Sequence, residues 1–104
     1  DGEYVMMKKR ASSFSGTPLA GYLRAAGVDT ILVTGVTATA CVRTTICDGL
    51  AEGFRTIAVK EAIGDRVPGA VAWNLFDIDA KFADVETTED CVRYLETVNR
   101  RNTV

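Results

Sequence analysis

Along this chain, segments with a strand-like hydrophobic pattern alternate with segments whose apolar residues have helical spacing. Short strand-like segments rich in apolar residues fall at residues 4–8, 30–33 and 54–59, and residues 84–85 could form a short edge strand. Between and after them, apolar residues recur every three or four positions, as on one face of a helix, over residues 18–26, 42–52, 70–82 and 88–98. Strands that alternate with helices in this way predict a parallel α/β sheet with right-handed crossovers. The run at 30–33 has the continuous apolar character of a strand that is buried on both faces.

Capping residues predict where several of these helices begin and end. Thr17 and Pro18 are typical of an N-cap followed by the first helical residue, and Gly27 is typical of the end of that helix. Thr87, with Asp90 three residues later, resembles a capping box at the start of the last helix. The expected apolar face of that helix consists of Cys91, Val92, Leu95 and Val98. Loops are expected at residues 11–16, around the anchoring side chain of Phe14, and at residues 61–69.

Several side chains have a structural interpretation. Cys47 and Cys91 lie on apolar helix faces, so we expect them in the core. For Trp73 and Phe76 we favour the core-facing side of their helix, the alternative being that they line the pocket of a neighbouring subunit. Lys81 and Asp84 are expected to form a weak surface pair.

Composition narrows the functional classes. The 104 residues fit one small domain, residues 1–104, or part of a larger one, and the net charge of -2 gives no support for binding to nucleic acid or an anionic membrane. No apolar run approaches the length that spans a membrane. Three cysteines without paired zinc spacing favour reduced thiols in a cytoplasmic protein. Because the chain has no histidine, Cys–His catalysis and His-ligated metals are excluded within it, and we expect no metal or cofactor.

Three reactive side chains are expected at one edge of the sheet. Lys8 ends the first predicted strand, Cys41 follows the second, and Arg66 follows the third after a short loop. Ligands of open parallel sheets bind outside the carboxyl ends of the strands. A cysteine at a strand-to-helix turn faces the N–H groups of the helix start, and these groups and a nearby ammonium favour its thiolate. Lys9 is expected to be a solvated charge, because neighbouring strand residues point to opposite faces.

The same segment offers groups that a hydrolytic reaction needs. The backbone N–H groups of Thr37 and Cys41 could face a developing oxyanion, although Thr37 could equally cap the following helix. The forked guanidinium of Arg66 suits a substrate carboxylate, whereas the alternative is a surface pair with Asp65 or Glu61. No carboxylate that could accept the thiol proton lies beside Lys8 or Cys41 in the sequence.

Three stretches together resemble a known family. Lys8 with the following Phe14, Gly16, Thr17 and Leu19, the segment Gly35-Val-Thr with Cys41-Val, and Gly64-Asp-Arg66 are similar to the isochorismatase-like cysteine hydrolases. The segments 11–17 and 74–84 and the residue Arg43 are most similar to the amidohydrolases of that family. Those enzymes act on small linear amides that carry a carboxylate, such as N-carbamoylsarcosine or maleamate. The similarity covers almost the whole chain.

The resemblance implies a three-layer α/β/α Rossmann-like fold, of which this chain is the C-terminal part. It implies a catalytic set of an aspartate, Lys8 and Cys41, with a cis peptide bond between Val36 and Thr37. It also implies substrate binding by Arg66 and Thr37. The family's aspartate lies in an N-terminal half that has no counterpart here, so an N-terminal segment or subunit is expected as a partner. A homo-oligomer is expected on the same ground.

The expected function is therefore that of the C-terminal portion of a cysteine amidohydrolase, which releases ammonia through a thioester intermediate. One alternative is a non-catalytic binding or assembly protein that retains the fold. Another is an isochorismatase-type hydrolase that cleaves a vinyl ether, although the retained cysteine favours the amidase.

Overall fold

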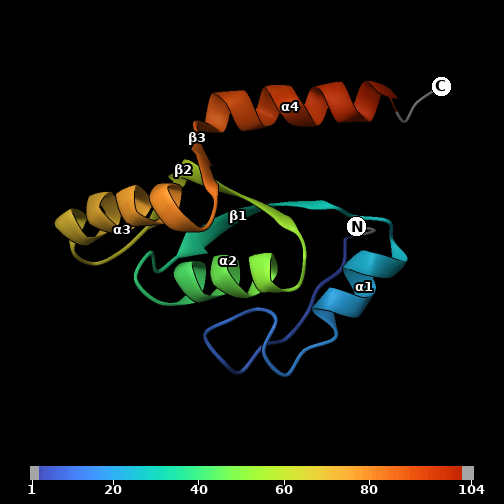
Figure 1. The fold of residues 1–104 in the computed structure, drawn as a ribbon, viewed down its shortest axis with the longest axis horizontal. Coiled ribbons are helices and arrows are strands. Elements are labelled where there is room, and N and C mark those ends of the chain that lie inside the picture. The colour runs from blue at the N-terminus through green and yellow to red at the C-terminus, as the bar shows by residue number, and fades with distance from the viewer. Residues whose placement is uncertain (1–2, 102–104) are drawn as a thin grey trace.

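The computed structural model describes the backbone of residues 3–101 and the side chains of residues 3–98. Helices and strands follow one another along this part of the chain (Figure 1). They are α1 (Leu19–Ala25), β1 (Thr30–Val36), α2 (Cys41–Ala51), β2 (Arg55–Gly64), α3 (Pro68–Lys81), β3 (Asp84–Glu86) and α4 (Thr88–Arg101). The alternation of strands and helices confirms the predicted α/β organisation.

The strands β1, β2 and β3 form one parallel sheet in that order. Thr30 of β1 lies opposite Arg55 of β2, and the crossover between these strands contains α2, as a parallel connection requires. The register of the pair shifts between Val33 and Gly35. Gly35 has a φ of 116°, a conformation that favours glycine. The irregularity therefore lies at the carboxyl end of β1, just before the segment that leads to Cys41.

The hydrophobic core lies between the sheet and the helices α2 and α3. Ile46 of α2 and Ile78 of α3 are both fully buried at 0% exposure. Gly49 allows α2 to approach the sheet closely, because a Cβ atom there would lie 2.8 Å from Cδ1 of Ile31. The buried residues of this core are Val33, Ala38, Val42, Ile46, Ala58, Ile63, Leu75 and Ile78.

The opposite face of the sheet is only partly covered. Helix α4 lies across it (Figure 1) and buries Cys91, whereas Val92 and Leu95, predicted for the same apolar face, are 49% and 52% exposed. Since strand side chains alternate between the two faces, Leu32 points toward the α4 side and stays half-buried. The expectation that residues 30–33 are buried on both faces is therefore wrong in this structure, where only Val33 of that run is buried.

The predicted strand at residues 4–8 is also wrong, because residues 3–9 form no regular secondary structure. A strand needs a neighbouring backbone to satisfy its N–H and C=O groups, and no described strand pairs with this segment. Val5 and Met7 are 90% and 85% exposed. Tyr4 stacks on Tyr22 of α1 with ring centroids 4.0 Å apart, so the segment lies against that helix instead.

Helix α1 begins one residue later than expected. Pro18 is its N-cap rather than its first residue, and Thr17 Oγ1 accepts a hydrogen bond from the Leu19 N–H at 3.4 Å. Gly27, with a φ of 75°, follows the end of the helix as predicted, and its N–H donates to the Arg24 carbonyl at 3.0 Å. The loop at residues 11–16 is confirmed, and its Phe14 stacks on Phe54 at 5.9 Å.

The structure corrects the predicted start of the loop after β2 and confirms the predicted start of α4. Strand β2 continues to Gly64, so the loop expected at residues 61–69 begins only after that residue. The start of α4 is confirmed, because the Asp90 N–H donates to Thr87 Oγ1 at 3.1 Å.

The core position predicted for Trp73 and Phe76 is wrong. Their side chains are 61% and 68% exposed and stack on each other at 5.8 Å. Helix α3 buries Asn74 and Asp77 beside Leu75 and Ile78, because the two polar side chains bind Arg43 of α2. A pattern of apolar positions alone cannot identify such a face.

The surface pair predicted between Lys81 and Asp84 is wrong as well. Lys81 Nζ lies 2.9 Å from the carboxylate of Asp77, four residues earlier on the same helix. The carboxylate of Asp84 lies 4.0 Å from Arg55 instead.

Candidate active site

Cys41 is the first residue of α2, and a short loop joins it to the end of β1. The peptide bond between Val36 and Thr37 is cis, as the resemblance implied. The loop is fixed from both sides, because the Ala38 N–H donates to the Gly64 carbonyl at 2.9 Å and the Val42 N–H to the Thr37 carbonyl at 3.0 Å. The structure thus confirms that the cysteine lies at a strand-to-helix turn.

Two backbone N–H groups of this turn are available to a ligand. Within the described residues, neither Thr37 nor Cys41 donates its N–H to a protein acceptor, whereas Thr39 and Val42 do. Thr37 also supplies the carbonyl that accepts the Val42 N–H, so it contributes to the start of α2. The side chain of Thr37 does not cap α2, however, because Ala40 is the N-cap and no side-chain hydrogen bond from the described residues caps this helix.

Lys8 and Cys41 line the same small pocket, whose volume is about 90 Å³. The ammonium of Lys8 donates to the carbonyls of Arg10 and Ala11, at 3.1 and 3.2 Å. Lys9 lines a different pocket with Met7. The prediction that Lys8, and not its neighbour, faces the cysteine is consistent with this arrangement, even though the strand expected to carry it is absent.

A contact that the sequence did not predict joins the Lys8 segment to the helix of Cys41. The Ser13 N–H donates to Thr45 Oγ1 at 3.0 Å, and both residues line the pocket with Cys41. Thr45 is buried and lies one helical turn after the cysteine. This hydrogen bond holds the loop that follows Lys8 against α2.

Arg66 lies on the loop after β2, at the same edge of the sheet, but it is exposed and does not line the pocket of Cys41. The structure therefore brings together two of the three residues expected to converge. The two carboxylates proposed as alternative partners of its guanidinium bind elsewhere. Asp65 accepts hydrogen bonds from Thr39 and Glu61 from Thr88.

The three cysteines differ in their surroundings. Cys41 and Cys47 are partly exposed, whereas Cys91 is buried at 5% exposure. Burial raises the pKa of the Cys47 thiol and that of the Cys91 thiol above the ordinary value for cysteine. Neither of these thiols shares the pocket with Lys8.

The pocket itself contains no acidic group within the described residues. Its lining consists of Lys8, Ser13, Val33, Thr34, Gly35, Val36, Cys41, Val42 and Thr45. The pocket offers a thiol and an ammonium, and Cys41 also carries an N–H that no described residue accepts, whereas Thr37 is not among the lining residues. A group that accepts and returns the thiol proton has to come from outside this set.

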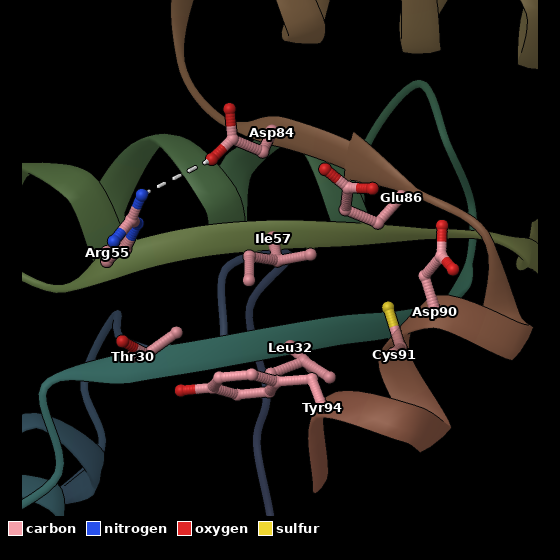
Figure 2. A pocket seen from close by; sticks show the side chains of 9 residues that line it. All are labelled: Thr30, Leu32, Arg55, Ile57, Asp84, Glu86, Asp90, Cys91 and Tyr94. Atoms are coloured by element: carbon pink, nitrogen blue, oxygen red, sulfur yellow. Dashed lines mark ion pairs between the residues drawn. The ribbon is translucent and has the colours of Figure 1, made fainter. Parts of the chain in front are cut away.

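A larger pocket, of about 310 Å³, lies on the other face of the sheet between the strands and α4 (Figure 2). Its lining includes Arg55 and Asp84, which form the ion pair drawn there, and the buried Cys91. Arg55 and Asp84 are the first residues of β2 and β3. Because ligands of parallel sheets bind at the carboxyl ends of the strands, the candidate site is the smaller pocket at Cys41. Within residues 3–101, no helix has the length and apolar character to cross a membrane.

Comparisons with known proteins identify relatives of this chain. Residues 1–90 match the isochorismatase domain. The chain is 55% identical to N-carbamoylsarcosine amidase of an Arthrobacter species, over 94% of this chain and 37% of that enzyme. It is 45% identical to maleamate amidohydrolase of Pseudomonas putida, over 90% of this chain and 44% of that enzyme.

Solved structures show the same fold. An isochorismatase-like hydrolase from Alkaliphilus metalliredigens superposes with a TM-score of 0.87 at 30% identity, covering 91% of this chain and 52% of that structure. A cysteine hydrolase from Pseudomonas syringae superposes with a TM-score of 0.86, also at 30% identity, covering 91% of this chain and 50% of that structure.

The parallel sheet and its helices define an α/β protein with a thiol at the carboxyl edge of the sheet. The chain belongs to the isochorismatase family. It spans less than half the length of the two curated relatives named above.

Proposed function

We propose that this chain is the part of a cysteine amidohydrolase that carries the nucleophile, and that the enzyme cleaves a small linear amide bearing a carboxylate. The observation that carries the proposal is the shared pocket of Lys8 and Cys41 at the start of α2. The names of both curated relatives denote hydrolysis of such a substrate, N-carbamoylsarcosine or maleamate.

In the proposed mechanism the Cys41 sulfur attacks the amide carbonyl carbon, and the thiol proton passes to a carboxylate. The carbonyl oxygen becomes an oxyanion, which accepts hydrogen bonds from the N–H groups of Thr37 and Cys41. The C–N bond then breaks, and the nitrogen takes the proton back from the carboxylic acid and leaves as ammonia. Water hydrolyses the remaining thioester, which releases the acid and restores the thiol.

Lys8 acts electrostatically in this scheme. Its ammonium, oriented by the Arg10 and Ala11 carbonyls, favours the thiolate of Cys41 and orients the proton-accepting carboxylate. The resemblance to the family implies that this carboxylate is an aspartate from an N-terminal segment or a separate subunit, and the pocket lining contains no carboxylate of its own. The complete enzyme is therefore this chain together with the part of the fold that its relatives have in addition.

In this scheme Thr37 contacts the substrate and Arg66 binds the substrate carboxylate. Its exposed guanidinium has no carboxylate partner among the described residues, which leaves its fork of donors open for a bidentate contact. The amide to be cleaved and the carboxylate are then held at two separate points, so that a short linear acid amide is oriented along the edge of the sheet.

The direct test is the Cys41→Ser variant of the complete enzyme, assayed for ammonia release from N-carbamoylsarcosine and from maleamate. We expect release to fall to the background rate, while the matched variant Cys47→Ser keeps the wild-type rate. Mass spectrometry of the rapidly quenched wild-type enzyme should find the acyl group on the peptide of Cys41. Full ammonia release by Cys41→Ser would overturn the mechanism and favour a non-catalytic role for this thiol.

A second test addresses the substrate class. The Arg66→Gln variant should raise the KM for the carboxylate-bearing amide and leave the KM for an uncharged amide of similar length unchanged. Equal effects on both amides would show that Arg66 does not bind the carboxylate.

A further inference from the structure

Asp65 makes an unusual set of contacts for a residue on a surface loop. It follows the last residue of β2, and its Oδ2 atom accepts two hydrogen bonds from Thr39, from the N–H at 3.1 Å and from Oγ1 at 2.7 Å. Its Oδ1 atom accepts a third, from the N–H of Arg66 at 2.6 Å. One carboxylate thus joins the loop before Cys41 to the loop that carries Arg66.

Thr39 lies midway between the two groups that are proposed to bind the oxyanion. Thr37 is two residues before it and Cys41 two residues after it, and the N–H of each is free of protein acceptors in the described part of the chain. The neighbouring Ala38 N–H is held by the Gly64 carbonyl at 2.9 Å. The loop at 37–40 has no ladder of strand hydrogen bonds, so these contacts with the end of β2 fix its peptide groups.

The Asp65 carboxylate is well suited to such a role. Hydrogen bonds from the Thr39 side chain and backbone hold the pKa of Asp65 below its usual range, so the group stays ionised near neutral pH. Hydrogen bonds to a charged acceptor are stronger than those between neutral groups. Asp65 does not line the pocket of Cys41, so it acts on the reaction through Thr39 rather than on the substrate.

We propose that Asp65 is a positioning residue, which holds Thr39 so that the N–H groups of Thr37 and Cys41 converge on the oxyanion. The inference rests on the proposed amidohydrolase function. A displacement of such donors by about 1 Å is enough to reduce a rate about 100-fold. The effect of losing the contact therefore falls on kcat and not on substrate binding, because the oxyanion exists only after the thiol has attacked.

The test uses the complete enzyme and the variants Thr39→Val, Thr39→Ser and Asp65→Asn. Valine removes the hydroxyl that donates to Asp65, whereas serine keeps it. We expect Thr39→Val to lower kcat by about 10- to 100-fold with the KM unchanged. Thr39→Ser should restore most of the wild-type kcat. Asp65→Asn, which removes the charge from the acceptor, should lower kcat at least as much.

Controls separate positioning from folding. Thr97 on α4 donates its hydroxyl to the backbone carbonyl of Arg93 at 3.0 Å, so Thr97→Val likewise removes a donating hydroxyl, but away from the site, and should keep the wild-type kcat. Iodoacetamide should alkylate Cys41 in Thr39→Val at the wild-type rate, because that reaction needs the thiolate but forms no oxyanion.

The outcomes separate the two proposals. If Cys41→Ser abolishes ammonia release but Thr39→Val has the wild-type kcat, the positioning role is wrong and the amidohydrolase proposal stands. Equal losses in Thr39→Val and Thr39→Ser, or a loss confined to KM, would also overturn the positioning role. Ammonia release that survives Cys41→Ser overturns the proposed function itself.

Discussion

The guanidinium of Arg43 on α2 donates a hydrogen bond to the carboxylate of Asp77 on α3, and this contact joins the two helices that cover one face of the sheet. Arg43 also donates to Asn74 Oδ1 at 3.0 Å and lies over the ring of Phe82, 5.5 Å from its centroid. The Asp77 side chain is only 12% exposed and receives a second ion pair from Lys81 at 2.9 Å. A polar network thus stands where the hydrophobic pattern predicted aromatic side chains.

We expect Arg43→Ala to lower the thermal midpoint of the complete enzyme by several degrees. The substitution leaves the Asp77 carboxylate largely buried with one of its two cationic partners removed, which is costly. The matched control is Arg93→Ala on α4, whose side chain is 66% exposed and pairs with Glu89 at 3.2 Å. Exposed ion pairs contribute little to stability, so the thermal midpoint of the Arg93→Ala variant should hardly change. Similar shifts in the two variants, measured by thermal unfolding, would contradict the importance of the network.

The same network predicts how stability depends on pH. Hydrogen bonds from Lys81 and Arg43 hold the pKa of Asp77 below its ordinary value. Because the pKa of Asp77 is lower in the folded state, its ionised carboxylate stabilises the fold at pH values above the unfolded-state pKa of about 3.9. This stabilisation is lost as the pH falls through the folded-state pKa. At pH 7, Asp77→Asn should therefore be less stable than the wild type. The gap should shrink as the pH is lowered below about 4, measured as unfolding free energy against pH.

Other carboxylates do not confuse this comparison. Hydrogen bonds also lower the pKa of Glu61 and Asp65. Both residues are present in the wild type and in the variant, so their contributions to the unfolding free energy cancel in the difference. A gap that stays constant down to pH 3 would show that Asp77 does not titrate against its cationic partners.

We expect the largest loss of stability from truncating a side chain in the core between α2 and the sheet. Ile46 is 0% exposed, and Ile46→Ala should lower the unfolding free energy by about 2–5 kcal/mol, because the truncation leaves a cavity that close packing cannot refill. Leu50 is one turn further along the same helix but 43% exposed, so Leu50→Ala should have a clearly smaller effect. Denaturant unfolding of the complete enzyme measures both. Equal losses would contradict the assignment of Ile46 to the core.

The sequence was sufficient to predict the alternation of strands and helices from residue 30 onward, since each of these elements has a local pattern and a local end signal. It was not sufficient for residues 4–8. Their apolar pattern is that of a strand, but a strand also needs a neighbour to pair with, and no described strand supplies one. The same limit explains Leu32, which is apolar as expected but only half-buried because α4 covers little of β1.

At the candidate site, too, only some features were predictable from the sequence. Cys41 was predictable because a helix start after a strand is a local feature, and Lys8 was placed by its spacing to Phe14 within the family motif. The hydrogen bonds of Thr39 to Asp65 and of Ser13 to Thr45 were not predictable, because they join residues 26 and 32 positions apart and no local pattern indicates either pairing. Asp65 lies within the family motif Gly64-Asp-Arg66, and this position was the signal that could have identified it.

The cysteines predict a selective chemical modification. Cys41 lies at a helix start beside a pocket that contains Lys8, whereas burial raises the pKa of Cys47 and Cys91 and keeps those thiols protonated at neutral pH. Iodoacetamide at pH 7 should therefore modify the peptide of Cys41 first. Peptide mass spectrometry over time measures the three rates. Faster modification of Cys47 would argue against an activated thiol at Cys41 and in favour of a non-catalytic protein.

Lys8 and Lys9 offer the sharpest comparison, because the two residues are neighbours of identical chemistry. Lys8 lines the pocket of Cys41, and its ammonium is oriented by two carbonyls, whereas Lys9 lines a separate pocket beside Met7. If the ammonium of Lys8 favours the thiolate, Lys8→Ala should lower kcat for amide hydrolysis by about 100-fold or more, the scale at which single electrostatic groups act in active sites.

The matched variant Lys9→Ala removes the same side chain one position away and should keep the wild-type kcat. The alkylation rate of Cys41 supplies a readout that does not depend on the substrate, and at pH 7 it should fall in Lys8→Ala but not in Lys9→Ala. If both lysine variants lost activity equally, the effect would belong to the segment at residues 3–9 rather than to one ammonium. If Lys9→Ala alone lost activity, the assignment of the catalytic lysine would have to move by one residue, and the side chain now in the pocket of Cys41 would have no part in the reaction.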